Sequence, residues 1–267
     1  MEEVESSSFL KRNVRQASLV SSLIVGISAI LAAMSGPLYR FDVIDLNTAL
    51  NIILRMSITY GLGIGVLIAI IAILLGLVYY KIHAFQYIKF AIISVIISSA
   101  VFAVPYSQLR RGAPPIHEIS TDLTNPPEFI DILPLRANAP NPPEYISEIT
   151  GYGMVVNVTE KQKEYYPDIQ PLVIGSDDYK DIFSVAKESV LEMGWTLVSH
   201  DEASGRIEAY DTTPWFGFVD DVVIRITKTL DTNVFVIDVR SKSRVGFGDV
   251  GANAERIRDY LALIENK

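Results

Sequence analysis

The sequence predicts a membrane-anchored α+β protein, in which an N-terminal region of three transmembrane helices precedes a C-terminal domain with an antiparallel sheet. Two observations predict this division. Of the 267 residues, 49% are apolar, which is a high share for a soluble protein. The charge is also uneven: residues 1–112 carry nine Lys and Arg against five Asp and Glu, whereas residues 113–267 carry fourteen against twenty-six. The two parts therefore hold +4 and −12, which sum to the net charge of −8.

Composition excludes several classes of function. The acidic C-terminal part is a poor partner for nucleic acid. The chain has no cysteine, which excludes disulfides, thiolate catalysis and cysteine-ligated metals. Its histidines, His83, His117 and His200, are scattered without the spacing of a metal site. We therefore expect neither a metal nor a cofactor.

Three apolar segments are long enough to cross about 30 Å of hydrocarbon. They cover about residues 19–38, 58–80 and 88–106. The first resembles a signal peptide, but it is longer than a cleaved apolar core and two more segments follow it. Small residues spaced four apart in the second segment indicate close helix packing, and we favour packing within this chain over dimerisation. These residues are Gly61, Gly65, Ala72 and Gly76.

Lys and Arg near the segment ends favour one orientation. Three spans place the chain ends on opposite sides of the membrane. With the N-terminus in the cytoplasm, the inner side holds five basic residues and the outer side four. The inner set is Lys11, Arg12, Arg15, Lys81 and Lys89, and the outer set is Arg40, Arg55, Arg110 and Arg111. We therefore expect the C-terminal half to lie outside the cytoplasm.

Proline becomes frequent directly after the last apolar segment, and we refer to residues 113–150 as the strap. Pro114-Pro115, Pro126-Pro127 and Pro142-Pro143 remove backbone donors and favour extended geometry, so the strap is predicted to be non-helical. It contains His117 beside acidic residues. That histidine is a candidate site residue, although a solvated or structural role is the commoner one.

Residues 151–267 are predicted to form the α+β domain. A short strand over 168–174 precedes a helix with Ser176 as its N-cap, in which apolar residues recur at helical spacing from Tyr179 to Met193. Four β-rich runs and a last helix follow. They cover residues 195–199, 206–210, 222–228, 234–240 and 254–265. The predicted order is β-α-β-β-β-β-α, with a sheet of four to five strands covered by two helices.

The last hairpin has a predictable register. Val222 and Ile224 must share the inward face with Ile237 and Val239. A two-residue turn at Asp231 and Thr232 satisfies that parity and places Arg225 opposite Asp238.

The last helix has a predictable buried side. It is expected to bury Ala254, Ile257, Leu261 and Ile264 and to expose Glu255, Arg256, Arg258 and Asp259.

Three stretches carry a resemblance to a known family. They are IHEISTDLTNPP at 116–127, FGFVDDV at 216–222 and RSKSRVGFGDVGANAERIR at 240–258. Together they show that about residues 113–267 resemble the uncharacterised family called domain of unknown function 1499, which occurs in bacteria and plastids. The resemblance implies a domain that is often attached to a membrane or exported. Together with the charge bias, it leads us to expect a bacterial inner-membrane protein with a cytoplasmic N-terminus and a periplasmic C-terminal domain. It implies no catalytic residue, because the family has no established activity.

The candidate site lies between the last strand and the last helix, where loop donors and a helix N-terminus can meet an anion. Its residues are Arg240, Ser241, Arg244, Asp249 and Asn253, with Asp220, Asp221 and His117 as further candidates. One interpretation is a small anionic or polar ligand held by Arg240, Ser241 and Arg244. The other is that the arginines pair with Asp220, Asp221 and Asp249 to hold the loop. We expect Arg240 to be structural and Arg244 to be free for a ligand.

These observations favour a binding or interaction domain that is anchored in the membrane and is not an enzyme. Its expected partners are the lipid bilayer and an envelope protein or small anionic ligand, and nucleic acid is not expected. The alternative is an enzyme that acts on an envelope or lipid-derived substrate through the arginine and aspartate cluster.

Overall fold

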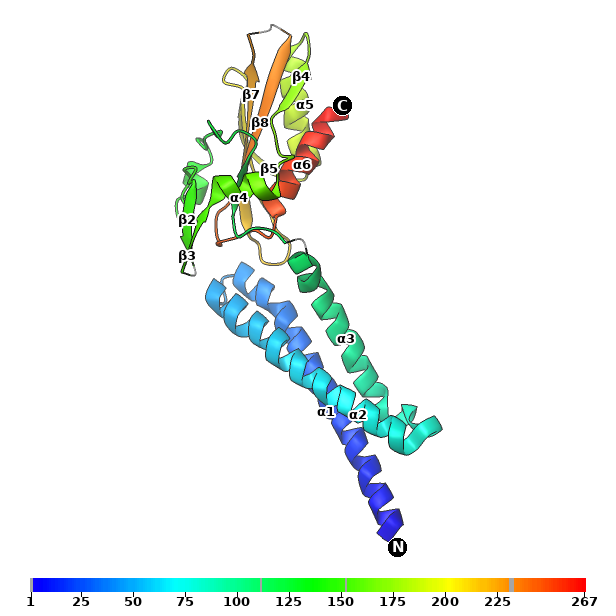
Figure 1. The fold of residues 1–267 in the computed structure, drawn as a ribbon. Coiled ribbons are helices and arrows are strands. Elements are labelled where there is room, and N and C mark those ends of the chain that lie inside the picture. The colour runs from blue at the N-terminus through cyan, green and yellow to red at the C-terminus, as the bar shows by residue number, and fades with distance from the viewer. Residues whose placement is uncertain (1, 111, 152, 231–232) are drawn as a thin grey trace. The chain divides into compact units, whose positions relative to one another are not determined.

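A computed structural model describes residues 2–110, 112–151, 153–230 and 233–267. The chain divides into two compact units (Figure 1). One is helical and contains the chain up to Arg110, and the other is an α+β unit that contains most of the remainder.

The helical unit contains three helices that are long and apolar enough to cross a membrane, as predicted. The apolar segments are Lys11–Arg40, Thr48–Tyr80 and Phe85–Ala103. They lie in α1 (Glu2–Arg40), in η1 (Thr48–Leu54), η2 (Ser57–Leu62) and α2 (Gly63–Tyr80), and in α3 (Phe85–Arg110). The short 3₁₀ turn η3 (Lys81–His83) connects α2 to α3.

Small residues of the second segment face neighbouring helices. A Cβ atom added to Gly65 would lie 2.5 Å from Val25 Cγ2 of α1, and one added to Gly76 would collide with Ile88 of α3. Ala72 is fully buried. The predicted close packing within this chain is therefore confirmed.

The α+β unit is built on a six-stranded antiparallel sheet. Its strands β5 to β8 form a meander, and β4 and β1 each pair with a different part of β8. The strands are β1 (Glu118–Ser120), β4 (Leu172–Gly175), β5 (Thr196–Asp201), β6 (Arg206–Thr212), β7 (Val219–Lys228) and β8 (Val234–Ser243). With α5 (Tyr179–Glu192) and α6 (Ala252–Glu265), the predicted order is confirmed as β4-α5-β5-β6-β7-β8-α6.

Further elements enlarge the predicted domain. Strand β1 lies inside the strap, as does the 3₁₀ turn η4 (Leu133–Arg136). A separate hairpin, β2 (Glu148–Gly151) with β3 (Met154–Asn157), leads into α4 (Val158–Tyr165). Strand β1 was not predicted because three residues are too few to show alternation.

The start of α5 corrects one prediction. Asp178, not Ser176, is the N-cap, because its carboxylate accepts a hydrogen bond from the Lys180 amide at 2.8 Å. The Ser176 hydroxyl lies two residues before this N-cap and accepts a hydrogen bond from the Asp178 amide.

The predicted register of the last hairpin is confirmed. Arg225 lies opposite Asp238, and the two form an ion pair at 2.8 Å. The predicted turn at Asp231 and Thr232 lies outside the described residues.

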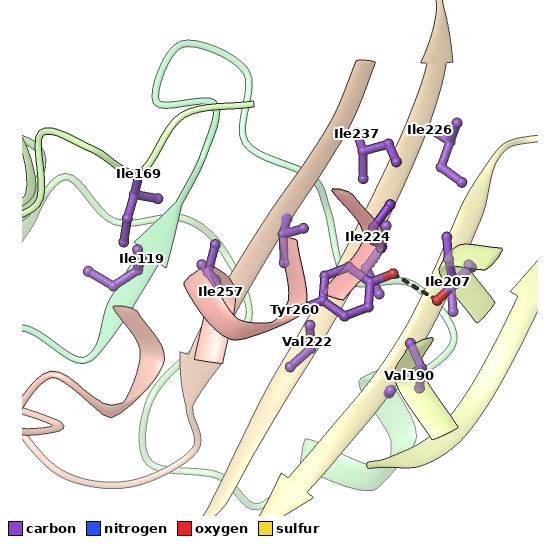
Figure 2. Packing of buried hydrophobic residues seen from close by; sticks show 14 of the residues in the cluster. Ile119, Ile169, Val190, Ile207, Val222, Ile224, Ile226, Ile237, Ile257 and Tyr260 are labelled. Atoms are coloured by element: carbon purple, nitrogen blue, oxygen red, sulfur yellow. Dashed lines mark hydrogen bonds between the residues drawn. The ribbon is translucent and has the colours of Figure 1, made fainter. Parts of the chain in front are cut away.

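One face of the sheet carries the apolar core, which the two helices cover (Figure 2). Val222, Ile224 and Ile237 are fully buried against Tyr260 and its neighbours, and the Tyr260 hydroxyl donates to the Ala186 carbonyl at 2.9 Å. Along α6, Ala254, Ile257 and Ile264 are buried as predicted, and Leu261 is half-buried.

The prediction that Arg256 is exposed was wrong. The side chain is buried because it forms ion pairs with Asp220 and Asp211 of the sheet, at 2.7 and 2.8 Å.

Candidate functional site

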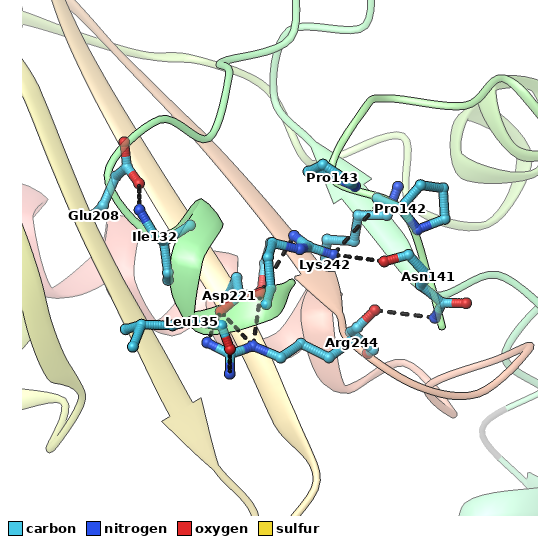
Figure 3. Close-up of polar contacts among 12 residues, drawn as sticks. Ile132, Leu135, Asn141, Pro142, Pro143, Glu208, Asp221, Lys242 and Arg244 are labelled. Atoms are coloured by element: carbon cyan, nitrogen blue, oxygen red, sulfur yellow. Dashed lines mark hydrogen bonds and ion pairs between the residues drawn. The ribbon is translucent and has the colours of Figure 1, made fainter. Parts of the chain in front are cut away.

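The other face of the sheet is polar, and the strap covers it (Figure 3). Side chains alternate along a strand, so Asp238, Arg240 and Lys242 of β8 point away from the core that Ile237 and Val239 enter. The strap is fastened to these side chains by buried ion pairs and backbone hydrogen bonds.

Arg240 and Lys242 share one carboxylate. The Arg240 Nε atom donates to Glu118 Oε1 at 2.6 Å, and Lys242 Nζ lies 2.9 Å from Oε2. Arg240 also donates to the carbonyls of Pro127 and Pro143, at 3.0 and 2.7 Å. All three charged side chains are at most 2% exposed. Arg240 is therefore structural, as expected, but its partner is Glu118 and not one of the predicted aspartates.

Arg244 is paired and not free for a ligand, which corrects the prediction (Figure 3). Its Nε and Nη2 atoms donate to Asp221 Oδ1 at 3.0 and 2.7 Å, and its Nη1 atom donates to the Leu135 carbonyl at 2.8 Å. Arg136, from η4, lies 3.2 Å from the same aspartate. The predicted pairing of Arg244 with Asp221 is confirmed.

Burial determines the electrostatics of this polar layer. Desolvation raises the pKa of the Asp221 carboxyl, and its bonds to Arg244 oppose that rise. Desolvation also lowers the pKa of the Lys242 ammonium, which Glu118 opposes. Asp221 and Lys242 therefore each depend on an ion-pair partner to stay charged inside the protein, as is typical of buried ion pairs.

Glu208 fastens a second part of the strap. Its carboxylate accepts from three consecutive backbone amides, those of Ile130, Asp131 and Ile132, at 2.9, 3.1 and 2.8 Å. Arg206 pairs with the same carboxylate at 3.0 Å. Figure 3 shows the bond from Ile132.

Ser241, Asn253 and Asp220 lie on the opposite, core side of the sheet. The Ser241 hydroxyl donates to Asn253 Oδ1 at 2.6 Å, and Asn253 Nδ2 donates to the His117 carbonyl at 3.1 Å. Asp220 pairs with Arg256, so the adjacent Asp220 and Asp221 point to opposite faces as expected. The predicted site residues are thus separated by the sheet.

Asp249 lies two residues before Gly251, the N-cap of α6. Its two carboxylate oxygens accept from the amides of Gly251 and Asn253, at 2.8 and 3.0 Å, and so bind the first turn of the helix. Burial raises the pKa of this carboxyl. The expected pairing of Asp249 with an arginine is replaced by this backbone role.

His117 differs from the other candidates because it lines a cleft of about 460 Å³, together with Asn141, Glu148 and Phe247. Its Nδ1 atom lies 3.4 Å from the Phe247 carbonyl oxygen. Burial, followed by the charge of Lys242, lowers the pKa of the ring. The histidine is therefore neutral at physiological pH.

Sequence reasoning missed four charged residues of the polar layer. Glu118 and Glu208 supply carboxylates that pair with arginines, and Lys242 and Arg136 share the carboxylates of Glu118 and Asp221 with Arg240 and Arg244. Lys242 had one usable signal: it follows Arg240 by two positions, so both must share a face of the strand. The strap residues gave no such signal, because irregular segments have no periodicity to place a side chain.

The fold and site define an α+β domain that follows three helices able to cross a membrane, with a strap fastened over the polar face of its sheet. Among the described residues, no group of three or more His, Asp or Glu is placed to hold a metal. The model of the family described as "Protein of unknown function (DUF1499)" matches residues 118–264, which is more than half of the chain. The chain therefore belongs to this family. No curated protein matches the sequence.

Proposed function

We propose that this protein is a membrane-anchored binding or interaction module whose α+β domain lies outside the cytoplasm, in the periplasm or an equivalent compartment of the cell envelope. One observation carries the proposal. The arginines that could act on a substrate are used to hold the strap, since Arg240 binds Glu118, and Arg244, paired with Asp221 of β7, donates to the Leu135 carbonyl of the strap.

The enzyme alternative requires titratable groups that converge on a concave site. Asp220 and Asp221 lie on opposite faces of the sheet, and Asp249 binds the backbone amides at the start of α6. The cleft beside His117 instead offers a place for a partner. In this proposal the bilayer holds the protein, and an envelope protein or a small polar ligand meets the domain.

The orientation rests on the charge bias of the span ends and is testable because the chain has no cysteine. Cysteine would be introduced singly at Asp42, His83 and Ser204, which are all exposed. Cells with an opened outer barrier but an intact cytoplasmic membrane would then be treated with a membrane-impermeant maleimide. We expect Asp42→Cys and Ser204→Cys to react and His83→Cys to react only after the membrane is dissolved. Labelling of His83→Cys alone in intact cells would reverse the orientation and refute an extracytoplasmic domain.

A further inference from the structure

The cleft beside His117 has the size and lining of a small-molecule site. It lies between the strap, the β2–β3 hairpin and the loop that follows β8, and its volume of about 460 Å³ falls within the usual range of about 300–1,000 Å³. Ile146, Ile149 and Phe247 supply apolar wall, and His117, Asn141 and Glu148 supply polar groups.

The contact of His117 with Phe247 fixes which ring nitrogen is protonated. A carbonyl oxygen can only accept a hydrogen bond, so Nδ1 must carry the hydrogen that it shares with the Phe247 carbonyl. The ring is neutral, which leaves Nε2 with a lone pair. Within the described parts of the chain Nε2 has no hydrogen-bond partner, although the residue is only 5% exposed.

Asn141 is oriented by the same logic. Its Nδ2 atom donates to the carbonyls of Ser243 and Gly246, at 3.0 and 2.9 Å, so the amide cannot be flipped without losing both bonds. The Oδ1 atom is therefore left as an acceptor, with no donor among the described residues. The exposed Glu148 carboxylate is a third acceptor at the cleft.

Charge then limits the ligand. A free anion would bring further acceptors to a cleft that already presents Glu148, His117 Nε2 and Asn141 Oδ1. A metal ion is not favoured either, because no group of three or more His, Asp or Glu among the described residues could hold one. The acceptors at the cleft therefore suit an uncharged molecule rich in hydrogen-bond donors.

We propose that this cleft binds an uncharged, polyhydroxylated small molecule of the carbohydrate class. Its hydroxyl groups donate to His117 Nε2 and Asn141 Oδ1, and its apolar edge packs against Ile149 and Phe247. This inference rests on the proposed binding function and names the ligand class of that module.

The test uses the full chain in detergent micelles with ¹⁵N-labelled histidine rings. His83→Gln and His200→Gln, both at exposed positions, leave His117 as the single reporter without changing the cleft. At neutral pH we expect a protonated Nδ1 and an unprotonated Nε2. Addition of N-acetyl-D-glucosamine should shift the Nε2 resonance in a saturable way, and inorganic phosphate at matched ionic strength should not.

A second measurement tests the contact directly. His117→Phe should weaken the binding of N-acetyl-D-glucosamine about tenfold or more, as expected for the loss of one buried hydrogen bond, whereas Ser204→Ala at an exposed turn should leave it unchanged. A protonated Nε2, a response to phosphate alone, or no response to the sugar up to its solubility would overturn the ligand class. None of these results bears on the orientation of the domain, which the cysteine labelling decides independently.

Discussion

Arg240 donates from its Nε atom to the Glu118 carboxylate at 2.6 Å, although the two residues are 122 positions apart in the sequence. Lys242 uses the other oxygen of the same carboxylate. A single buried carboxylate is therefore shared by two buried cations and attaches β1, within the strap, to β8 at the edge of the meander.

Glu118→Gln should destabilise the domain strongly. The substitution keeps the shape of the side chain but leaves Arg240 and Lys242 buried beside a neutral amide, a change that typically costs about 3–5 kcal/mol. Chemical denaturation of the full chain in detergent would measure it. Glu164→Gln, which removes an exposed partner of Lys161, is the matched control and should leave the denaturation midpoint unchanged. A Glu118→Gln protein as stable as the parent would show that the polar layer does not hold the strap.

Arg244→Met and Arg240→Met should both lower stability, and phosphate should not change either effect. Arg240→Met removes one partner of Glu118 and also the donor to the carbonyls of Pro127 and Pro143, and should cost about 3–5 kcal/mol. Arg244→Met should cost less, about 1–3 kcal/mol, because Asp221 keeps Arg136. Melting temperatures at low and high phosphate would measure both. If phosphate stabilised the parent but not Arg244→Met, Arg244 would instead belong to an anion site, as the sequence led us to expect.

His117 should make stability depend on pH in the weakly acidic range. Burial lowers the pKa of this ring below its usual value of 6.5, so below pH 6.5 the unfolded chain binds a proton that the folded domain does not. The free energy of unfolding should therefore fall as pH falls from 6.5 toward the lower folded pKa, by at most about 1.4 kcal/mol per pH unit.

The measurement is the pH dependence of the denaturation midpoint in the parent and in His117→Phe. The stability of the parent relative to that of His117→Phe should fall as pH falls through this window, because the variant has no ring to protonate. His200→Gln, at an exposed histidine, is the control and should follow the parent. A parent whose stability relative to His117→Phe stays constant or rises toward acid pH would contradict a neutral, buried His117.

Gly65→Ala should disturb the helical unit, whereas Gly63→Ala should be tolerated. An added Cβ at Gly65 meets Val25 at 2.5 Å, but nothing lies within 4 Å of one added at Gly63. Both changes raise helix propensity equally, so their difference isolates the packing, and overpacking typically costs about 1–3 kcal/mol. Thermal loss of helical circular dichroism in detergent would report it. Equal stability of the two variants would mean that α1 and α2 do not pack closely at Gly65.

Sequence periodicity was sufficient to predict the regular helices and strands of the α+β domain from β4 to α6. The order of strands and helices from β4 to α6 follows from alternation in the strands and from the spacing of apolar residues in α5 and α6. The pairing of Arg225 with Asp238 also follows, because only one parity brings Ile224 and Ile237 to the same face. The apolar spans follow from length and composition alone.

The partners of the charged residues required the tertiary structure. Arg256 was predicted to lie on the exposed side of its helix because charged side chains normally favour solvent. It instead forms ion pairs with Asp220 and Asp211 of the sheet. Arg244 was expected to be free because the sequence places it in the loop after the last strand, yet Asp221 of β7 and the Leu135 carbonyl of the strap bind it. Such contacts have no local signal, since they depend on where an irregular segment passes over the sheet.

By itself, the sequence determined the three apolar spans, the order of the α+β elements and the polar alternation of β8, because each depends on residues close together in the chain. Only the tertiary structure decided that Glu118 pairs with both Arg240 and Lys242, and that His117 lies at a cleft with Asn141. The physical reason is that a buried charge is stable only beside its partner, and here that partner is supplied by the strap, whose path is set by the completed sheet.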